Sequence, residues 1–291
     1  MAVKRLVVNA DDFGFTSDVN EGILRSHRDG IVRSASLMAN GPAFEHAVQI
    51  ARRHPTLGVG CHLTLVQGEA LASPGTQLPL SAARLLANPP ARDEALREFR
   101  AQIEFLLDRG IRPSHLDTHQ HVHLLPVVLD AVATLADHFR IPWIRKPFDT
   151  PFGMAPMLRM GLSLAIRPWR IPFEERLRRA RCRTSDYFAG FVATGAMDAR
   201  RLAALLAGLP GGIGELMCHP GICGPELLRA HTKLKRSREK EMNALCSSDV
   251  RQAVAKHGIE LLSYADLAAD AAAVPALPRT SHGSDPIDQV P

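Results

Sequence analysis

Short runs of apolar, β-branched residues alternate along the chain with longer segments in which apolar positions recur every three or four residues. The short runs predict strands, and the longer segments predict amphipathic helices. The predicted strands cover residues 5–10, 31–38, 57–65, 114–119, 141–146, 214–218 and 259–263. Strands that alternate with helices indicate a parallel sheet, and about seven such units favour a closed or nearly closed barrel. We therefore predict an α/β fold, namely a distorted, TIM-like (β/α) barrel.

Two helices have recognisable boundaries. The segment 95–110 places Leu96, Phe99 and Ile103 on one face and ends in a glycine that can act as a C-cap. Pro126 opens another helix at a position where its missing N–H has no intrahelical partner to lose. These boundaries fit helices that connect successive parallel strands.

The predicted domain is a single barrel over residues 1–270, with a helical excursion near 150–200. Residues 274–291 are rich in Pro, Ser and Asp and have no periodicity, which predicts a flexible C-terminal tail. Within the excursion, residues 158–183 interleave eight arginines with apolar side chains. Such a segment either packs on the barrel as an ordinary amphipathic element or meets an anionic membrane or a lipid-linked substrate.

Composition excludes several classes of protein. The net charge is +5, but only 5% of the residues are aromatic and no zinc-finger or RNA-binding motif is present, so nucleic acid is not an expected partner. No apolar run approaches the roughly 20 residues that cross a bilayer, and the N-terminus does not read as a secretory signal. We expect a cytoplasmic protein. The five cysteines form no CxxC pair, which favours reduced thiols.

Two adjacent carboxylates, Asp11 and Asp12, follow the first predicted strand. Active sites of β/α barrels lie at the carboxyl ends of the strands. Neighbouring residues of a strand face opposite ways, so both can share one site only if the chain is already turning, which Gly14 permits. Read alone, this segment is merely a turn with solvated caps. His62, near the end of the third predicted strand, is by itself usual for a core histidine.

The strongest local signal is the segment 114–123, SHLDTHQHVH. Period-two spacing would line its polar residues on one face of an extended segment. Four histidines so close together are costly to desolvate unless something binds them, and neutral imidazole is a common ligand of transition metals. Spacing does not decide which of them are ligands. The others would orient the ligands through the far ring nitrogen. The four histidines from which the ligands would come are His115, His119, His121 and His123.

Two further elements lie at predicted strand ends. His219 precedes Pro-Gly and is either a general acid or a structural turn histidine. Arg145 could hold a catalytic carboxylate by a bidentate pair and keep its pKa low, although basic residues at strand ends are common.

Taken together and in order, NADDFG, GCHLTL, SHLDTHQHVHLLP, the Arg-x-Pro at 145–147 and MCHPG resemble the YdjC-like carbohydrate deacetylases, the chitooligosaccharide deacetylase group. These are distant relatives of the NodB-type polysaccharide deacetylases, and a hopanoid-associated glycolipid deacetylase branch is one alternative within the group. The resemblance runs from about Lys4 to Leu267. It implies a distorted β/α barrel and the removal of an acetyl group from an N-acetylated amino sugar, either an oligosaccharide or a glycolipid.

The resemblance also implies roles for individual residues. Asp12, His62 and His119 match the metal ligands, and the metal would be one divalent ion, Zn²⁺ or Mg²⁺. Asp11 matches the catalytic base, His219 the acid-side histidine, and Arg145 the arginine that braces the base. On geometric grounds, His121 or His123 could still replace His119.

Other functions remain open. A different metal-dependent hydrolase, acting on a phosphoester or a cyclic amide, would need a second ion, for which Asp117 is the nearby bridging candidate. A non-enzymatic sugar- or lipid-binding protein is a further alternative. A glycosidase needs two carboxylates and no metal, and the histidine cluster disfavours it. Expected partners are the sugar or glycolipid, a membrane surface at residues 158–183 and a second copy of the chain in a homodimer.

Overall fold

The computed structural model describes residues 3–149 and 157–272, so the predicted tail at 274–291 lies outside the described residues. The strands are β1 Lys4–Phe13, β2 Ser34–Leu37, β3 Gly58–Leu63, β4 His115–Thr118, β5 Trp143–Ile144, β6 Tyr187–Ala189, β7 Gly212–Cys218 and β8 Ile259–Leu262. The α-helices are α1 Ser17–Arg28, α2 Phe44–Arg53, α3 Ala82–Ala87, α4 Arg92–Asp108, α5 Pro126–His138, α6 Met157–Ile166, α7 Arg170–Arg179, α8 Ala199–Ala207, α9 Pro225–Arg229, α10 Arg236–Leu245, α11 Ser248–Lys256 and α12 Tyr264–Ala272. Two 3₁₀ helices are η1 His119–Leu124 and η2 Arg167–Trp169.

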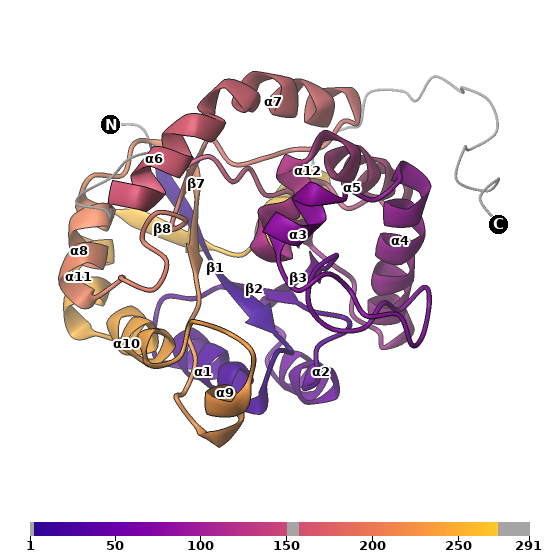
Figure 1. Ribbon diagram of the computed structural model, residues 1–291. Helices are drawn as coiled ribbons and strands as arrows, with labels where there is room; N and C mark the ends of the chain where they lie inside the picture. Colours follow the sequence, from indigo (N-terminus) through magenta and orange to yellow (C-terminus); the bar gives the residue numbers. More distant parts are fainter. Residues whose placement is uncertain (1–2, 150–156, 273–291) are drawn as a thin grey trace.

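The strands form one parallel sheet that curls into a nearly closed barrel, with helices around it (Figure 1). The strand order is β5-β4-β3-β2-β1-β7-β6, and β8 pairs with the first half of β1 while β2 pairs with its second half. Parallel bridges from Trp143 to Arg183 and from Asp149 to Phe188 bring the two ends of this order together. The predicted α/β barrel is confirmed.

All seven predicted strands are present, most of them shorter than predicted. The prediction missed β6, which has only three residues and therefore almost no periodicity to detect. The prediction of an extended segment through 123 was wrong. Strand β4 ends at Thr118, and Gln120 and His121 take left-handed backbone angles, with φ of 54° and 55°. The histidines beyond Thr118 therefore do not share one face.

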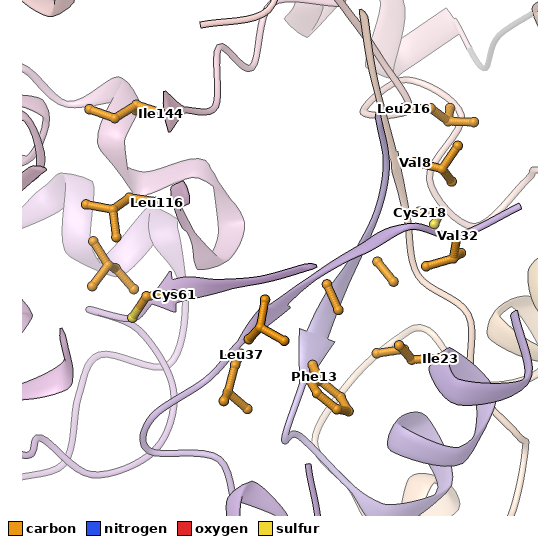
Figure 2. Close-up of a cluster of buried hydrophobic side chains, with 14 of the residues drawn as sticks. Val8, Phe13, Ile23, Val32, Leu37, Cys61, Leu116, Ile144, Leu216 and Cys218 are labelled. Carbon is orange, nitrogen blue, oxygen red and sulfur yellow. The ribbon is translucent and has the colours of Figure 1, made fainter. Parts of the chain in front are cut away.

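Side chains alternate between the two faces of the curled sheet, as strand geometry requires. Apolar residues point outward, where they pack against helices. Figure 2 shows this cluster, which includes Val8, Phe13, Leu37, Cys61, Leu116, Ile144, Leu216 and Ile23 of α1. The neighbouring residues, in the same strands or directly after them, point into the barrel, and most of them are polar: Asn9, Asp11, Ser36, His62, His115, Asp117, Arg145 and Glu215. The barrel interior thus holds a buried polar network enclosed by an apolar shell.

A close contact between two glycines fixes the loop after β7 against α1. A Cβ atom on Gly22 would lie 2.3 Å from the Cα of Gly221, and Gly221 follows His219 by two residues. Backbone cannot give way there as a flexible side chain could. The position of His219 therefore depends on the absence of a side chain at Gly22.

We expect Gly22→Ala to destabilise the fold by about 1–3 kcal/mol, the usual range for overpacking. Gly161 in α6 is a matched control, since a Cβ there meets nothing within 4 Å. Gly161→Ala should be neutral or stabilise by up to about 1 kcal/mol, because alanine reduces the entropy of the unfolded chain. Urea unfolding of both variants measures the difference. Equal stability of the two variants would contradict the close contact.

Among the described residues, no helix is both long enough and apolar enough to span a membrane.

Candidate metal centre and catalytic site

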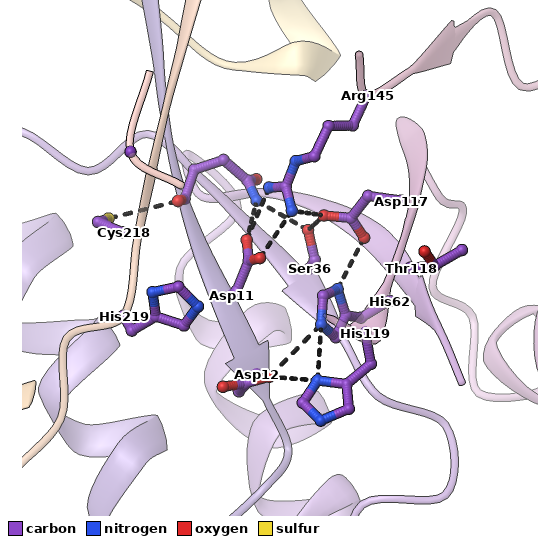
Figure 3. A network of polar contacts seen from close by, with 12 residues as sticks. Asp11, Asp12, Ser36, His62, Asp117, Thr118, His119, Arg145, Cys218 and His219 are labelled. Carbon is purple, nitrogen blue, oxygen red and sulfur yellow. Dashed lines mark hydrogen bonds and ion pairs between the residues drawn. The ribbon is translucent and has the colours of Figure 1, made fainter. Parts of the chain in front are cut away.

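Asp11 and Asp12 lie at the carboxyl end of β1 and point to different parts of one site (Figure 3). The turn that lets both face inward is at Asp12 itself, whose φ is 67°, followed by Gly14 at 92°. Such angles are uncommon for residues with a side chain and tend to occur at functional sites. Both carboxyl groups are buried.

Three possible ligand atoms meet at the mouth of the barrel. The Oδ1 atom of Asp12 lies 3.0 Å from Nδ1 of His119 and 3.4 Å from Nε2 of His62, and these two nitrogens are 3.3 Å apart. The residues come from β1, from β3 and from the start of η1. The structure therefore brings together the three residues that the sequence suggested as ligands.

The far ring nitrogen of each histidine is held by another side chain. Nδ1 of His62 lies 2.8 Å from Oδ1 of Asp117, and Nε2 of His119 lies 2.9 Å from Oε1 of Gln67. Because these acceptors take the ring N–H, the opposite nitrogen of each ring presents its lone pair to Asp12. Carboxylate and carbonyl partners of this kind orient metal-bound histidines.

This donor set fits a divalent cation. Asp12 Oδ1 is buried and makes no hydrogen bond, and two imidazole lone pairs face it, so the three atoms repel one another unless a positive charge lies between them. A tetrahedral ion with bonds of about 2.0–2.1 Å would hold its ligands about 3.3 Å apart. The observed separations are close to this value. Imidazole ligands favour Zn²⁺ over Mg²⁺.

Neighbouring charges shift the pKa values of His62 and Asp12. Burial alone would lower the pKa of His62, but the charge of Asp117, the hydrogen bond to it and the nearby Asp12 carboxylate raise it to about 10. A cation at this point would take the place of that proton, because a metal ligand has to be the neutral ring. Burial would raise the pKa of Asp12, but the Arg238 charge and His119 hold it well below its usual range.

Arg238, from α10, is a buried partner of the cluster that the sequence analysis missed. Its Nη2 atom donates to Oδ2 of Asp12 at 2.5 Å, and its side chain is 2% exposed. This bond occupies one oxygen of the carboxylate and leaves Oδ1 facing the two histidines. Arg238 thus directs Asp12 to offer a single oxygen to the cluster.

Arg145 is a second buried arginine, and it joins three carboxylates. Its Nη1 and Nη2 atoms donate to the two oxygens of Asp11 at 2.6 Å each, a bidentate pair. Nη1 also lies 2.7 Å from Asp117, and Nε donates to Glu215 at 2.7 Å. These carboxylates raise the pKa of Arg145 although burial opposes them. Ser36 and Tyr264 complete the network by donating to Asp117 and Glu215.

His219 lies after β7 on the side of Asp11 and Asp12 away from Arg145 (Figure 3). Its backbone N–H donates to Glu241 at 2.9 Å, while its Nδ1 atom is buried without a hydrogen bond. Burial lowers the pKa of His219 to about 4, although Asp11 and Asp12 act in the opposite direction. The ring is therefore neutral near pH 7 before any reaction begins.

The other histidines of the 114–123 segment face elsewhere. His123 donates from Nε2 to the backbone carbonyl of Arg145 at 3.1 Å, and its Nδ1 accepts from Thr118. The ring of His121 packs edge-on against Phe188 and Phe191. Neither belongs to the groups of candidate ligand atoms found among the described residues, in which His119 is the one that joins Asp12 and His62.

Several residues of the site escaped the sequence analysis for different reasons. Ser36 and Glu215 carry a detectable signal, since each is a polar residue that alternates with outward-facing apolar residues in a strand. Gln67 lies in a loop and Arg238 in a polar helix, where nothing nearby in the sequence marks them. Their contact with the site depends on long-range packing.

Comparison with known proteins gives a consistent result. Residues 5–256 match the YdjC-like protein family. A carbohydrate deacetylase of Geobacillus stearothermophilus is 34% identical over 268 residues, which cover 89% of this chain and 96% of the relative. One from Brevibacillus brevis is 31% identical, covering 90% and 99%. The crystal structure of a putative cellobiose-phosphate cleavage protein from Enterococcus faecalis V583 matches with a TM-score of 0.76 and 26% identity, covering 91% and 99%.

Proposed function

The chain belongs to the YdjC-like protein family, and on this basis we propose that it is a carbohydrate deacetylase that depends on one divalent metal ion. The substrate is an N-acetylated amino sugar, in an oligosaccharide or a glycolipid, and the products are acetate and the free amine. The observation that carries the metal dependence is the convergence of Asp12 Oδ1, His62 Nε2 and His119 Nδ1 within 4.8 Å of one another. The full-length similarity to carbohydrate deacetylases supports the reaction.

Asp12, His62 and His119 would hold the ion. When bound, the ion would lower the pKa of a water molecule and polarise the acetamide carbonyl. Three protein ligands leave positions open for both groups, as catalytic metal sites require. Zn²⁺ suits these ligands better than Mg²⁺.

Asp11 would take the proton from the attacking water. Its two oxygens are fixed by Arg145, and Asn9 donates a further hydrogen bond to Oδ1 at 3.0 Å, so the carboxylate is held in one orientation. A general base that is already held in one orientation loses little conformational entropy when the reaction begins, and this favours catalysis. Arg145 would act as a positioning residue for the base.

His219 would pass a proton to the departing nitrogen. The ring starts neutral, and negative charge that develops on the acetamide oxygen would raise its pKa, as Asp11 and Asp12 already tend to do. The proton that Asp11 takes from water would then pass to this ring, and the ring would donate it to the amine as the C–N bond breaks.

The alternatives are less well supported. Asp117, the bridging candidate for a second ion, is bound by His62, Ser36 and the fully buried Arg145. The fixed positive charge of Arg145 opposes a second cation at this point. A glycosidase would need a protonated carboxyl group near a carboxylate, whereas Asp11 and Asp117 are both paired with Arg145.

An acetate-release assay tests the proposed function. The panel contains chitooligosaccharides, a small N-acetylglucosaminyl metabolite and an N-acetylglucosaminyl lipid, each with and without a chelator. We expect acetate from at least one of them, loss of activity with the chelator, and recovery on adding Zn²⁺. Activity that is unaffected by complete metal removal would overturn the metal dependence. No acetate from any substrate with the metal-loaded protein would leave the binding-protein alternative.

The contact of Arg238 with Asp12 gives a second test that does not depend on the substrate. We expect Arg238→Gln to weaken Zn²⁺ binding by roughly 10- to 100-fold, as is usual for residues that orient a ligand. Arg236→Gln is the control, since Arg236 is exposed on the same helix. Isothermal titration of Zn²⁺ into the metal-free proteins measures both affinities. Unchanged affinity of the Arg238 variant would contradict the role of this residue.

A further inference from the structure

Positive charge is concentrated in one part of the molecule, residues 157–183, which we call the α6–α7 segment. It contains eight arginines and two glutamates, a net charge of +6. The whole chain has a net charge of +5, so all other residues together carry −1. Outside this segment the protein is therefore close to neutral, and the basic character of the sequence belongs almost entirely to it.

The same segment exposes large apolar side chains. Met160 is 37% exposed, Leu164 53% and Ile171 66%. They make up three of the seven large hydrophobic residues exposed across the described part of the chain. In Figure 1 the helices α6 and α7 follow one another along the outside of the barrel, at the top of the view. Exposure of these apolar side chains to water is unfavourable, and burying them against an apolar partner would be favourable.

The inner face of α7 is firmly attached to the barrel. Phe173 and Leu177 are buried, and Phe173 packs against Phe148 with ring centroids 5.3 Å apart. Glu174 accepts from Lys146 at 3.0 Å, and Arg176 pairs with Asp130 of α5 at 2.6 Å. The helix therefore presents its outer face from a fixed position.

Arginines of the α6–α7 segment also bring positive charge to solvent. Arg167, Arg178 and Arg179 are exposed, and so are Arg181 and Arg183 just beyond α7. Exposed arginines and exposed aliphatic residues within one segment match a bilayer interface, where guanidinium groups meet lipid phosphates and apolar side chains enter the headgroup layer. Nucleic acid would use the arginines but would leave the aliphatic residues in water.

We propose that the α6–α7 segment binds the surface of an anionic lipid bilayer. Met160, Leu164 and Ile171 enter the headgroup layer, and the exposed arginines contact lipid phosphates. The attachment is peripheral and involves no spanning helix. It does not rest on the proposed deacetylation, because it follows from charge and exposure outside the catalytic site.

Cosedimentation with vesicles tests this proposal. We expect the full chain to bind phosphatidylcholine vesicles that contain phosphatidylglycerol, to bind pure phosphatidylcholine vesicles weakly, and to dissociate as salt screens the charges. The double variant Arg178→Gln, Arg179→Gln should bind about 30-fold more weakly, at about fivefold per charge. Leu164→Gln with Ile171→Gln should also weaken binding.

Matched controls are Arg200→Gln in α8 and Leu228→Gln in α9, which remove an exposed arginine and an exposed leucine elsewhere. Both should bind vesicles like the unmodified protein. Absence of binding to anionic vesicles would overturn the proposal, as would equal weakening by the control variants. Binding that duplex DNA competes away, and that the Leu164 and Ile171 changes leave intact, would assign the surface to nucleic acid instead.

The outcome is independent of catalysis. Vesicle binding is measured without substrate, and Asp11→Asn should bind vesicles as the unmodified protein does. A protein that releases acetate but does not bind vesicles would overturn the lipid surface alone.

Discussion

Asp11→Asn is expected to reduce acetate release by about 10²- to 10⁴-fold, the contribution usual for a positioned general base, while Zn²⁺ binding is retained. The amide has nearly the shape of the carboxylate but cannot accept a proton from water. The buried guanidinium of Arg145 keeps Asp117 and Glu215 as partners, so the fold should survive the change. The measurements are kcat for acetate release and the Zn²⁺ affinity from isothermal titration.

Asp108→Asn is the control for this variant, because Asp108 is exposed at the end of α4 and belongs to neither group of candidate metal ligands. It should keep full activity. Loss of Zn²⁺ binding in Asp11→Asn would exchange the roles of Asp11 and Asp12. Full activity with Zn²⁺ bound would show that another group takes the proton from water.

His62→Ala is expected to lose both Zn²⁺ binding and activity, and the loss of affinity should exceed the roughly 10- to 100-fold typical of residues that only orient a ligand. The change removes one of the three donor atoms and leaves Asp117 without its imidazole partner. His119→Ala should behave in the same way. Asp117→Asn, which keeps all three donors, should fall within the smaller range.

Isothermal titration and acetate release compare these variants with His231→Ala, whose histidine is exposed. The control should match the unmodified protein in both measurements. Unchanged Zn²⁺ affinity in His119→Ala would require His121 or His123 to supply the third ligand, although their rings face Phe188, Phe191 and the Arg145 carbonyl. Unchanged affinity in His62→Ala would reject the metal centre as described.

Arg145 links the candidate site to the stability of the barrel. Arg145 is fully buried and is held by Asp11, Asp117 and Glu215, and burial raises the pKa of Glu215 to about 7 while Arg145 opposes the rise. Removing one partner from a buried ion pair costs about 3–5 kcal/mol, because the remaining charge is left without compensation. The same contacts that fix Asp11 and His62 therefore also hold the strands together.

The sequence by itself determined the barrel and pointed to most of the residues that the structure brings together at the candidate site. Short apolar runs between helical segments predicted the strands, because every second side chain of a strand packs against the outer helices. Asp11, His62, Arg145 and His219 could be located because each directly follows or ends such a run, and strand ends of a parallel barrel meet at one mouth. The segment 158–183 could be singled out from its charge alone.

Only the tertiary structure decided which atoms face one another. The sequence could not choose among His119, His121 and His123, because the choice depends on the left-handed turn at Gln120 and His121, which breaks the strand period. It could not find Arg238, which reaches Asp12 across 226 positions of the chain from a helix with no distinctive local pattern. Contacts of this kind arise from the packing of whole elements, and the local periodicity of the sequence does not predict them.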